Sequence, residues 1–164
     1  MNPGFEKFRK QIIHPLRFGA FMLQKLPSAF FAGLRIKELD EQHATVSVKY
    51  KWFNQNPFRS MYFAIQSMAA EMSTGLLGFG QIYGRDPAVS MLVVGIEARF
   101  SKKVTGRVSF TCSDGEAINT AIENSLATGD GHTVVCRSAG VNEAGELVSE
   151  FFVTWSFKAR SVKK

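Results

Sequence analysis

The stretch Trp52-Phe53-Asn54-Gln55-Asn56-Pro57, which runs into residues 58–75, decides the fold, because a strand pattern stops there and a helical pattern begins. Asn56 suits an N-cap, and Pro57 suits the first helical position because its missing N–H needs no partner there. Gly75 can close the far end. Apolar residues recur at three- and four-residue steps and define one buried stripe: Met61, Ile65, Met68, Met72 and Leu76. The sequence therefore predicts one long central helix over about residues 57–76.

Two strand patterns precede this helix, at residues 34–39 and 44–52. In the second strand apolar and polar residues alternate, so we expect one sheet face to be buried and the other to be wet. The residues expected on the buried face are Val46, Val48, Tyr50 and Trp52, and those on the wet face are Thr45, Ser47, Lys49 and Lys51.

Glycines break up the sequence after the helix pattern and predict a loop that reaches Pro87: Gly75, Gly78, Gly80 and Gly84. These glycines lack the strand–loop–helix context and the lysine of a phosphate-binding loop, so we assign them no nucleotide-binding role. Four more strand patterns follow, at residues 91–100, 107–113, 133–141 and 147–158, with a short amphipathic helix inserted at 115–126. We expect strand 91–100 to lie at a sheet edge.

This element order predicts an α+β fold in which a six-stranded antiparallel sheet wraps the long helix, because the sheet must bury its apolar face. Residues 1–27 form a separate N-terminal helical extension and residues 28–164 a single domain. Pro15 interrupts the extension, which indicates two short helices or one kinked helix. Two roles stay open for the extension: a helix that packs over the domain, or a basic amphipathic element that contacts a membrane surface or closes a pocket.

Composition excludes several classes of protein. The net charge of +6 is spread along the 164 residues, which gives little support for nucleic-acid binding. Cys112 and Cys136 fall in apolar runs without zinc-type spacing and are expected to be buried thiols. No segment reaches the roughly 20 apolar residues that span a bilayer, and the N-terminal segment has no signal-peptide core. We expect a soluble cytoplasmic protein without metal, cofactor or membrane contact.

Glu71 is the candidate acid–base residue. It falls near the end of the predicted helix, where a carboxylate opposes the helix dipole, and its neighbours are apolar: Met68, Ala69, Ala70 and Met72. Such surroundings disfavour the ionised form and suit a catalytic base. The alternative is a structural carboxylate that pairs with a lysine or arginine at a dimer seam.

The element order and the motif Asn-Pro-Phe-Arg-Ser-Met-Tyr-Phe-Ala at 56–64, followed by Ala-Ala-Glu at 69–71, resemble the hot-dog fold. Within that fold the chain is similar to acyl-CoA thioesterases of the phenylacetate-pathway type and to an uncharacterised related family, over residues 31–158. These thioesterases place an Asn or Gln before a His-Gly-Gly turn and an Asp or Glu nine residues after the His. Asn56 matches the amide and Glu71 the carboxylate, whereas Tyr62-Phe63-Ala64 stands where the His-Gly-Gly turn would be.

The resemblance implies a homodimer, or a dimer of dimers, that hydrolyses or binds an acyl thioester such as acyl-CoA between subunits. Glu71 and Asn56 would be catalytic, and backbone amides near residues 56–60 would stabilise the oxyanion. The residues implied in substrate binding are Arg59, Ser60, Tyr62, Phe63, Ser67, Thr74, Lys102 and Lys103. Among them Arg59, Lys102 and Lys103 would meet the coenzyme A phosphates, or would simply be solvated charges. The alternatives are a non-catalytic binder of a fatty acyl chain or other lipid, and a membrane-surface accessory protein.

Overall fold

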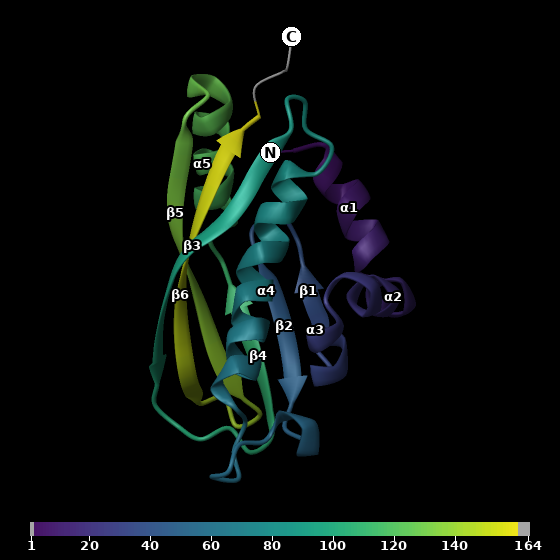
Figure 1. The fold of residues 1–164 in the computed structure, drawn as a ribbon, viewed down its shortest axis with the longest axis vertical. Coiled ribbons are helices and arrows are strands. Elements are labelled where there is room, and N and C mark those ends of the chain that lie inside the picture. Colours follow the sequence, from purple (N-terminus) through teal and green to yellow (C-terminus); the bar gives the residue numbers. More distant parts are fainter. Residues whose placement is uncertain (1, 161–164) are drawn as a thin grey trace.

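A computed structural model describes residues 2–160 of the chain (Figure 1). Its centre is a six-stranded sheet with the order β1-β2-β4-β5-β6-β3, in which all neighbouring strands are antiparallel. The strands are β1 (Arg35–Leu39), β2 (Ala44–Lys49), β3 (Val89–Phe100), β4 (Arg107–Cys112), β5 (Gly131–Asn142) and β6 (Leu147–Ala159). The sheet curves around one long helix, which confirms the expected α+β architecture, and β3 lies at the predicted edge.

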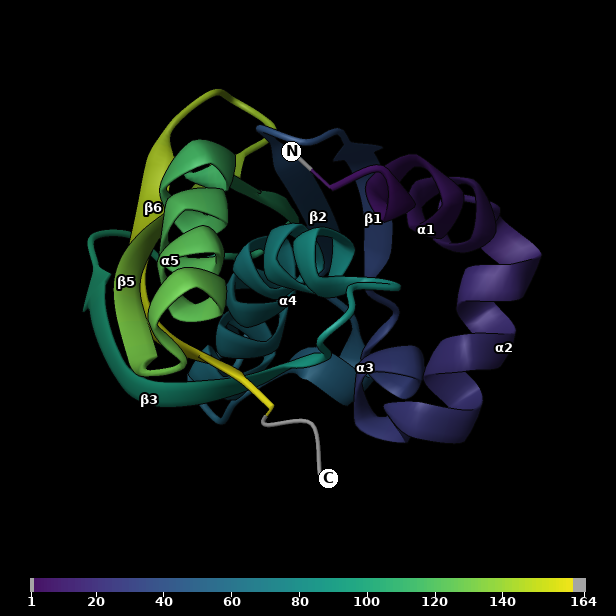
Figure 2. The ribbon, with the colours of Figure 1, turned by 90° about the horizontal axis from the view of Figure 1, so that it is seen from above.

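Within residues 2–160, six helical segments accompany the sheet: α1 (Gly4–Ile12), α2 (Pro15–Lys25), α3 (Pro27–Ala32), the 3₁₀ helix η1 (Trp52–Asn54), α4 (Phe63–Ile82) and α5 (Gly115–Thr128). Figure 2 shows α4 in the hollow of the sheet, with α5 on one side of it and α1, α2 and α3 on the other. The break between α1 and α2 falls at the predicted Pro15, since proline cannot continue a helix but suits its first turn.

The start of α4 differs from the prediction. The helix begins at Phe63, and Tyr62 occupies the N-cap with an extended backbone (φ −62°, ψ 135°). Asn56 instead organises a turn: its Oδ1 accepts the N–H of Phe58 at 2.9 Å and that of Ser60 at 3.3 Å, and Arg59 takes a left-handed φ of 56°. The prediction that Asn56 caps the helix was wrong because an Asn-Pro pair starts turns as readily as helices.

The end of α4 also differs. The helix continues through Gly75, Gly78 and Gly80 to Ile82, so the predicted loop after Gly75 was wrong. These glycines allow close packing: a Cβ at Gly78 would lie 2.7 Å from the Met91 methyl group, and one at Gly80 would lie 2.4 Å from the Phe5 ring. Glycine lowers helix stability locally, but it is tolerated where a larger side chain would clash with residues that pack against the helix.

Strand β2 is shorter than predicted. It ends at Lys49, and Trp52 lies in η1 with 82% of its surface exposed, so Trp52 does not face the core. Val46 and Val48 are buried as predicted, but Thr45 and Ser47 are buried as well. The alternating pattern was therefore right for Val46, Val48, Lys49 and Lys51, and wrong for Thr45, Ser47 and Trp52.

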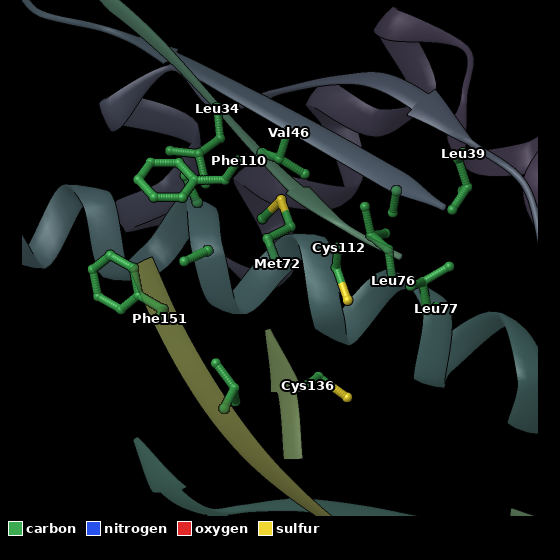
Figure 3. Close-up of a cluster of buried hydrophobic side chains, with 14 of the residues drawn as sticks. Leu34, Leu39, Val46, Met72, Leu76, Leu77, Phe110, Cys112, Cys136 and Phe151 are labelled. Atoms are coloured by element: carbon green, nitrogen blue, oxygen red, sulfur yellow. The ribbon is translucent and has the colours of Figure 1, made fainter. Parts of the chain in front are cut away.

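The core lies between α4 and the sheet (Figure 3). Met72, Leu76 and Leu77 of α4 belong to the same buried cluster as Phe110 and Phe151 of the strands. Both cysteines are free and buried in this region. Burial of each large apolar side chain contributes about 1.5–3 kcal/mol, which makes this contact the main source of stability.

The N-terminal helices share this core. Phe5, Phe8, Phe18 and Met22 belong to the same buried cluster as the side chains of α4. The Asn2 side-chain amide donates hydrogen bonds to the carbonyls of residues 80, 81 and 83, at 3.1, 3.0 and 2.8 Å. Carbonyls at the end of a helix lack intrahelical partners, so Asn2 acts as a cap for α4. Within residues 2–160, no helix has both the length and the apolar character that crossing a membrane requires.

Candidate functional site

Two of the cavities along α4 are lined by candidate residues. The first, which we name the α2–α4 cavity, has about 450 Å³ and is lined by residues that include Phe18, Phe21, Glu71, Gly75, Phe79 and Trp155. The second, the α4 N-terminal pocket, has about 510 Å³ and is lined by residues that include Asn56, Ser60, Tyr62, Phe63, Lys102 and Lys103. The candidate residues that line a cavity are thus divided between two cavities, one at the middle of α4 and one at its N-terminus.

Glu71 is partly buried in the α2–α4 cavity. Its carboxyl group forms no hydrogen bond or ion pair with any residue from 2 to 160. Burial raises the pKa of Glu71 above the ordinary 4.5, because the ionised form is poorly solvated there. The sequence placed Glu71 near the helix end, but it lies in the middle of Phe63–Ile82, so desolvation rather than the helix dipole disfavours its charge.

Gly75 and Trp155 form the wall beside this carboxyl group. A Cβ at Gly75 would lie 3.4 Å from Glu71 Oε1 and 3.3 Å from the Trp155 ring. Gly75 therefore leaves the space into which the Glu71 side chain extends. Trp155 lies on β6 and Glu71 on α4, so only the folded chain brings both residues to one cavity.

Thr74 has a structural role that the sequence did not indicate. Its hydroxyl is buried, donates to the backbone carbonyl of Glu71 at 2.9 Å and accepts the indole N–H of Trp155 at 2.8 Å. The hydroxyl does not contact the Glu71 carboxyl group, which has no partner within residues 2–160. Thr74 therefore orients Trp155, and its role in substrate binding stays a prediction.

Six of the predicted residues line the α4 N-terminal pocket, but some of their side chains are engaged in contacts within the protein. The Asn56 side chain is occupied by the turn, since its Nδ2 donates to Ser60 Oγ at 3.1 Å while its Oδ1 accepts backbone N–H groups. Lys102 pairs with Glu146 at 2.6 Å. Lys103 is exposed and forms no ion pair within residues 2–160, and Arg59 lies on the exposed turn, outside the lining of this pocket.

Free backbone donors stand at the start of α4. The first N–H groups of a helix have no intrahelical acceptor, so those of Phe63 and Ala64 remain available. They belong to Tyr62-Phe63-Ala64, the segment aligned with the His-Gly-Gly turn of the thioesterases. We had expected these donors near residues 56–60, but part of that segment is held in the Asn56 turn.

The amide donors and Glu71 are too far apart to act together within one chain. Phe63 and Glu71 are eight residues apart on α4, which corresponds to about 12 Å along a helix axis. Ser67 lies between them on the helix, is partly buried and lines neither cavity. The chain therefore carries two half-sites: a carboxyl group in an apolar cavity, and a set of N–H donors beside a lysine-bearing rim.

A model of a domain of unknown function, DUF4442, matches residues 16–157. The chain belongs to the DUF4442 family. Comparison with curated proteins gave no match. The family description assigns no activity to this DUF4442 domain, so a proposal about its function has to rest on the fold and on the candidate site.

Solved structures show the shared fold of this DUF4442 domain. It is similar to PA5026 from Pseudomonas aeruginosa, described as a protein of unknown function and probable thioesterase, with a TM-score of 0.74, 18% identity and coverage of 92% of this chain and 99% of that one. It is also similar to the thioesterase HI1161 from Haemophilus influenzae, with a TM-score of 0.66, 14% identity and coverage of 85% and 88%. A mutant of the thioesterase PA1618 from Pseudomonas aeruginosa gives a TM-score of 0.65 at 12% identity, with coverage of 98% and 97%. These likenesses show a hot-dog fold.

Proposed function

We propose that the protein hydrolyses an acyl thioester at a site that two copies of the chain complete, with Glu71 as the general base. The observation that carries the proposal is the Glu71 carboxyl group, which lies in an apolar cavity without a partner among residues 2–160. A carboxyl group with a raised pKa is a better base at neutral pH than an ordinary glutamate, and such a base contributes about 10²–10⁴ to the rate. A structural glutamate would be ion-paired, and Glu71 forms no ion pair within the described part of the chain, although Arg160 lines the same cavity.

In the proposed reaction the apolar acyl group lies in the α2–α4 cavity. Glu71 removes a proton from a water molecule as the water oxygen attacks the thioester carbonyl carbon. The resulting oxyanion accepts hydrogen bonds from free N–H groups at the start of α4, each worth about 3 kcal/mol in comparable sites. The carbon–sulfur bond then breaks, and the thiol leaves with the proton that Glu71 had taken.

A second copy of the chain is needed for this reaction because one chain holds its donors about 12 Å from its carboxyl group. The N–H groups of Phe63 and Ala64 would come from one copy and Glu71 from the other. Lys102 and Lys103, at the rim of the α4 N-terminal pocket, and Arg59 nearby would attract the phosphates of a coenzyme A carrier. Of these, Lys103 has the clearer role because Lys102 is already paired with Glu146.

The test is thiol release from short-, medium- and long-chain and aryl acyl-CoA by the purified protein and by Glu71→Gln. Glutamine keeps the size of the side chain but cannot accept the proton, so we expect at least a hundredfold loss of turnover, about 2.7 kcal/mol of barrier. Glu116→Gln, at an exposed glutamate of α5, is the matched control and should keep full activity. Full activity in Glu71→Gln would remove Glu71 from the mechanism.

One observation favours a second function, a non-catalytic carrier of an acyl chain or other lipid. Phe63 and Ala64 place side chains where the thioesterases have glycines, and Phe63 leaves 55% of its surface exposed beside the free amides. These side chains restrict how closely a thioester carbonyl can approach. A carrier would bind acyl-CoA without releasing thiol, and Glu71→Gln would not weaken that binding.

A further inference from the structure

Helix α2 forms one wall of the α2–α4 cavity. Phe18 and Phe21 on its inner face line the cavity opposite Met72, Leu76 and other residues of α4. Figure 2 shows α2 at the outer side of the molecule, with α1 and α3 at its two ends. The outer face of α2 carries Leu16 and Leu23, which are exposed. The two faces of this helix can therefore be changed independently.

The position of α2 is held from both sides. The Arg9 Nε of α1 donates to the Leu39 carbonyl at 2.7 Å, and Asn2 ties the start of α1 to the end of α4. Beyond α2, the Asn54 side chain donates to the carbonyl of Ala32, the last residue of α3, at 2.9 Å. The wall formed by α2 thus has a defined distance from α4.

A smaller cavity of about 230 Å³ lies next to the first one, between α1, α2 and α4. Ile12, Phe21 and Phe79 line both cavities. These three side chains therefore stand between the two spaces. Phe79 is held edge-to-face against Phe8 at 5.2 Å, whereas Phe21 has no ring partner among residues 2–160.

The lining chemistry indicates the ligand. Apart from Glu71, Ser90 and Arg160, the residues that line the larger cavity are apolar or glycine. Its volume of about 450 Å³ lies within the usual range for small-molecule sites, roughly 300–1,000 Å³. Such a space suits an alkyl chain whose polar end lies toward the three polar residues, Glu71, Ser90 and Arg160, and whose apolar part lies against the remaining lining.

We infer that the α2–α4 cavity holds the alkyl chain of the substrate and that Phe21, with Phe79 and Ile12 beside it, sets the chain length that the cavity accepts. The inference rests on the proposed function for the acyl nature of the ligand, and it adds the residues that determine specificity. An alkyl chain that fills the larger cavity ends against the Phe21 side chain. A smaller side chain at this position joins the second cavity to the first and admits a longer chain.

The test is calorimetric binding of straight-chain fatty acids, from hexanoate to octadecanoate, to the whole protein and its variants. In the wild type, affinity should rise about fourfold for each added methylene group and then stop rising once the chain reaches Phe21. Phe21→Ala should move that limit to longer chains, and Phe21→Trp should move it to shorter ones. Leu23→Ala, on the outer face of the same helix, should leave the limit where it is in the wild type.

Melting curves accompany each variant, and Phe79→Leu provides a second route if Phe21→Ala does not fold. An unchanged chain-length limit in folded Phe21→Ala and Phe21→Trp would overturn the inference, as would an absence of fatty-acid binding to the wild type. The outcome is separable from that of the proposed function. If the Phe21 variants change the chain length at which affinity stops rising but no thiol is released, the inference stands and hydrolysis is rejected. If thiol is released but that chain length is the same in all variants, hydrolysis stands and the inference is rejected.

Discussion

The proposed function depends mainly on Glu71, because no residue from 2 to 160 forms an ion pair with its carboxyl group. A buried carboxyl group with a cationic partner usually has a lowered pKa, whereas desolvation alone raises it. In this protein the second situation applies, since burial is the cause of the raised pKa. The protein therefore loses stability when Glu71 ionises in the folded state, and a residue kept at such a disadvantage is a candidate for function.

The pH dependence of stability follows from the direction of this shift. Above the ordinary pKa of 4.5 the unfolded chain releases the Glu71 proton while the folded chain still holds it, so this group makes stability fall as pH rises through that window. Glu71→Gln does not titrate. In urea unfolding from acid to neutral pH, the stability of Glu71→Gln relative to the wild type should therefore increase as pH rises above about 4.5 and level off beyond the raised pKa.

Glu116→Gln is the control for this measurement, because Glu116 is exposed on α5. It reports how the loss of an exposed carboxyl group changes urea unfolding. A pH-independent difference between Glu71→Gln and the wild type would show that the Glu71 carboxyl group is solvated and that its pKa is ordinary.

Helix α4 shows which parts of a helix the sequence can reveal. The apolar spacing from Ile65 to Leu76 identified the buried face, because that face must repeat with the helix period. The boundaries were wrong at both ends. Asn56-Pro57 satisfies the chemistry of a turn as well as that of a helix start, and the glycines beyond Leu77 are explained by the bulk of Phe5, Met91 and Phe157, which lie far from them in sequence.

Gly80 provides a test of this packing argument. A Cβ there would lie 2.4 and 2.6 Å from two ring carbons of the fully buried Phe5. Gly80→Ala should destabilise the protein by about 1–3 kcal/mol in chemical denaturation, although helix propensity alone would favour alanine by about 1 kcal/mol. The matched control is Gly19→Ala in α2, where the nearest heavy atom would be 3.9 Å away. That variant should be neutral or more stable, and equal effects at the two positions would contradict the role given to Gly80.

The candidate site was predictable only where its residues are close in sequence. Asn56, Ser60, Tyr62 and Phe63 fall in one motif and do share one pocket with Lys102 and Lys103. The α2–α4 cavity was not predictable, because its walls come from α2, α4, β3 and β6. Hydrophobic periodicity indicates which face of α2 is apolar. It does not indicate whether that face packs tightly against the rest of the protein or leaves a cavity.

Strand β3 is the surface through which we propose that two chains associate. It has 12 residues, lies at the sheet edge and exposes Leu92, Val94 and Ile96. A long apolar edge strand presents unpaired backbone groups that readily pair with another chain, and a lysine on such an edge discourages the pairing. We expect the wild type to be a homodimer by light scattering at micromolar concentration, and Ile96→Lys to shift the mass toward the monomer and to lower thiol release with it.

Val135→Lys is the control for this experiment. Val135 is exposed to a similar extent, 59% against 53% for Ile96, but lies on β5, which has neighbours on both sides in the sheet. It should keep the mass of the wild type. A wild-type protein that is monomeric and still active would contradict the proposal that two copies complete the site.

The hydrogen bonds of Asn2 have a consequence for the order in which the chain folds during synthesis. Asn2 is made first, but the carbonyls that it caps are 78 to 81 residues further along. At about 5–20 residues per second, the N-terminal helices wait roughly 4–16 s before their acceptors have been translated. The apolar faces of α1 and α2 lack their partner surface on α4 during that time. The α2–α4 cavity cannot be complete until β6 has also been made, because residues of β3 and β6 belong to its lining.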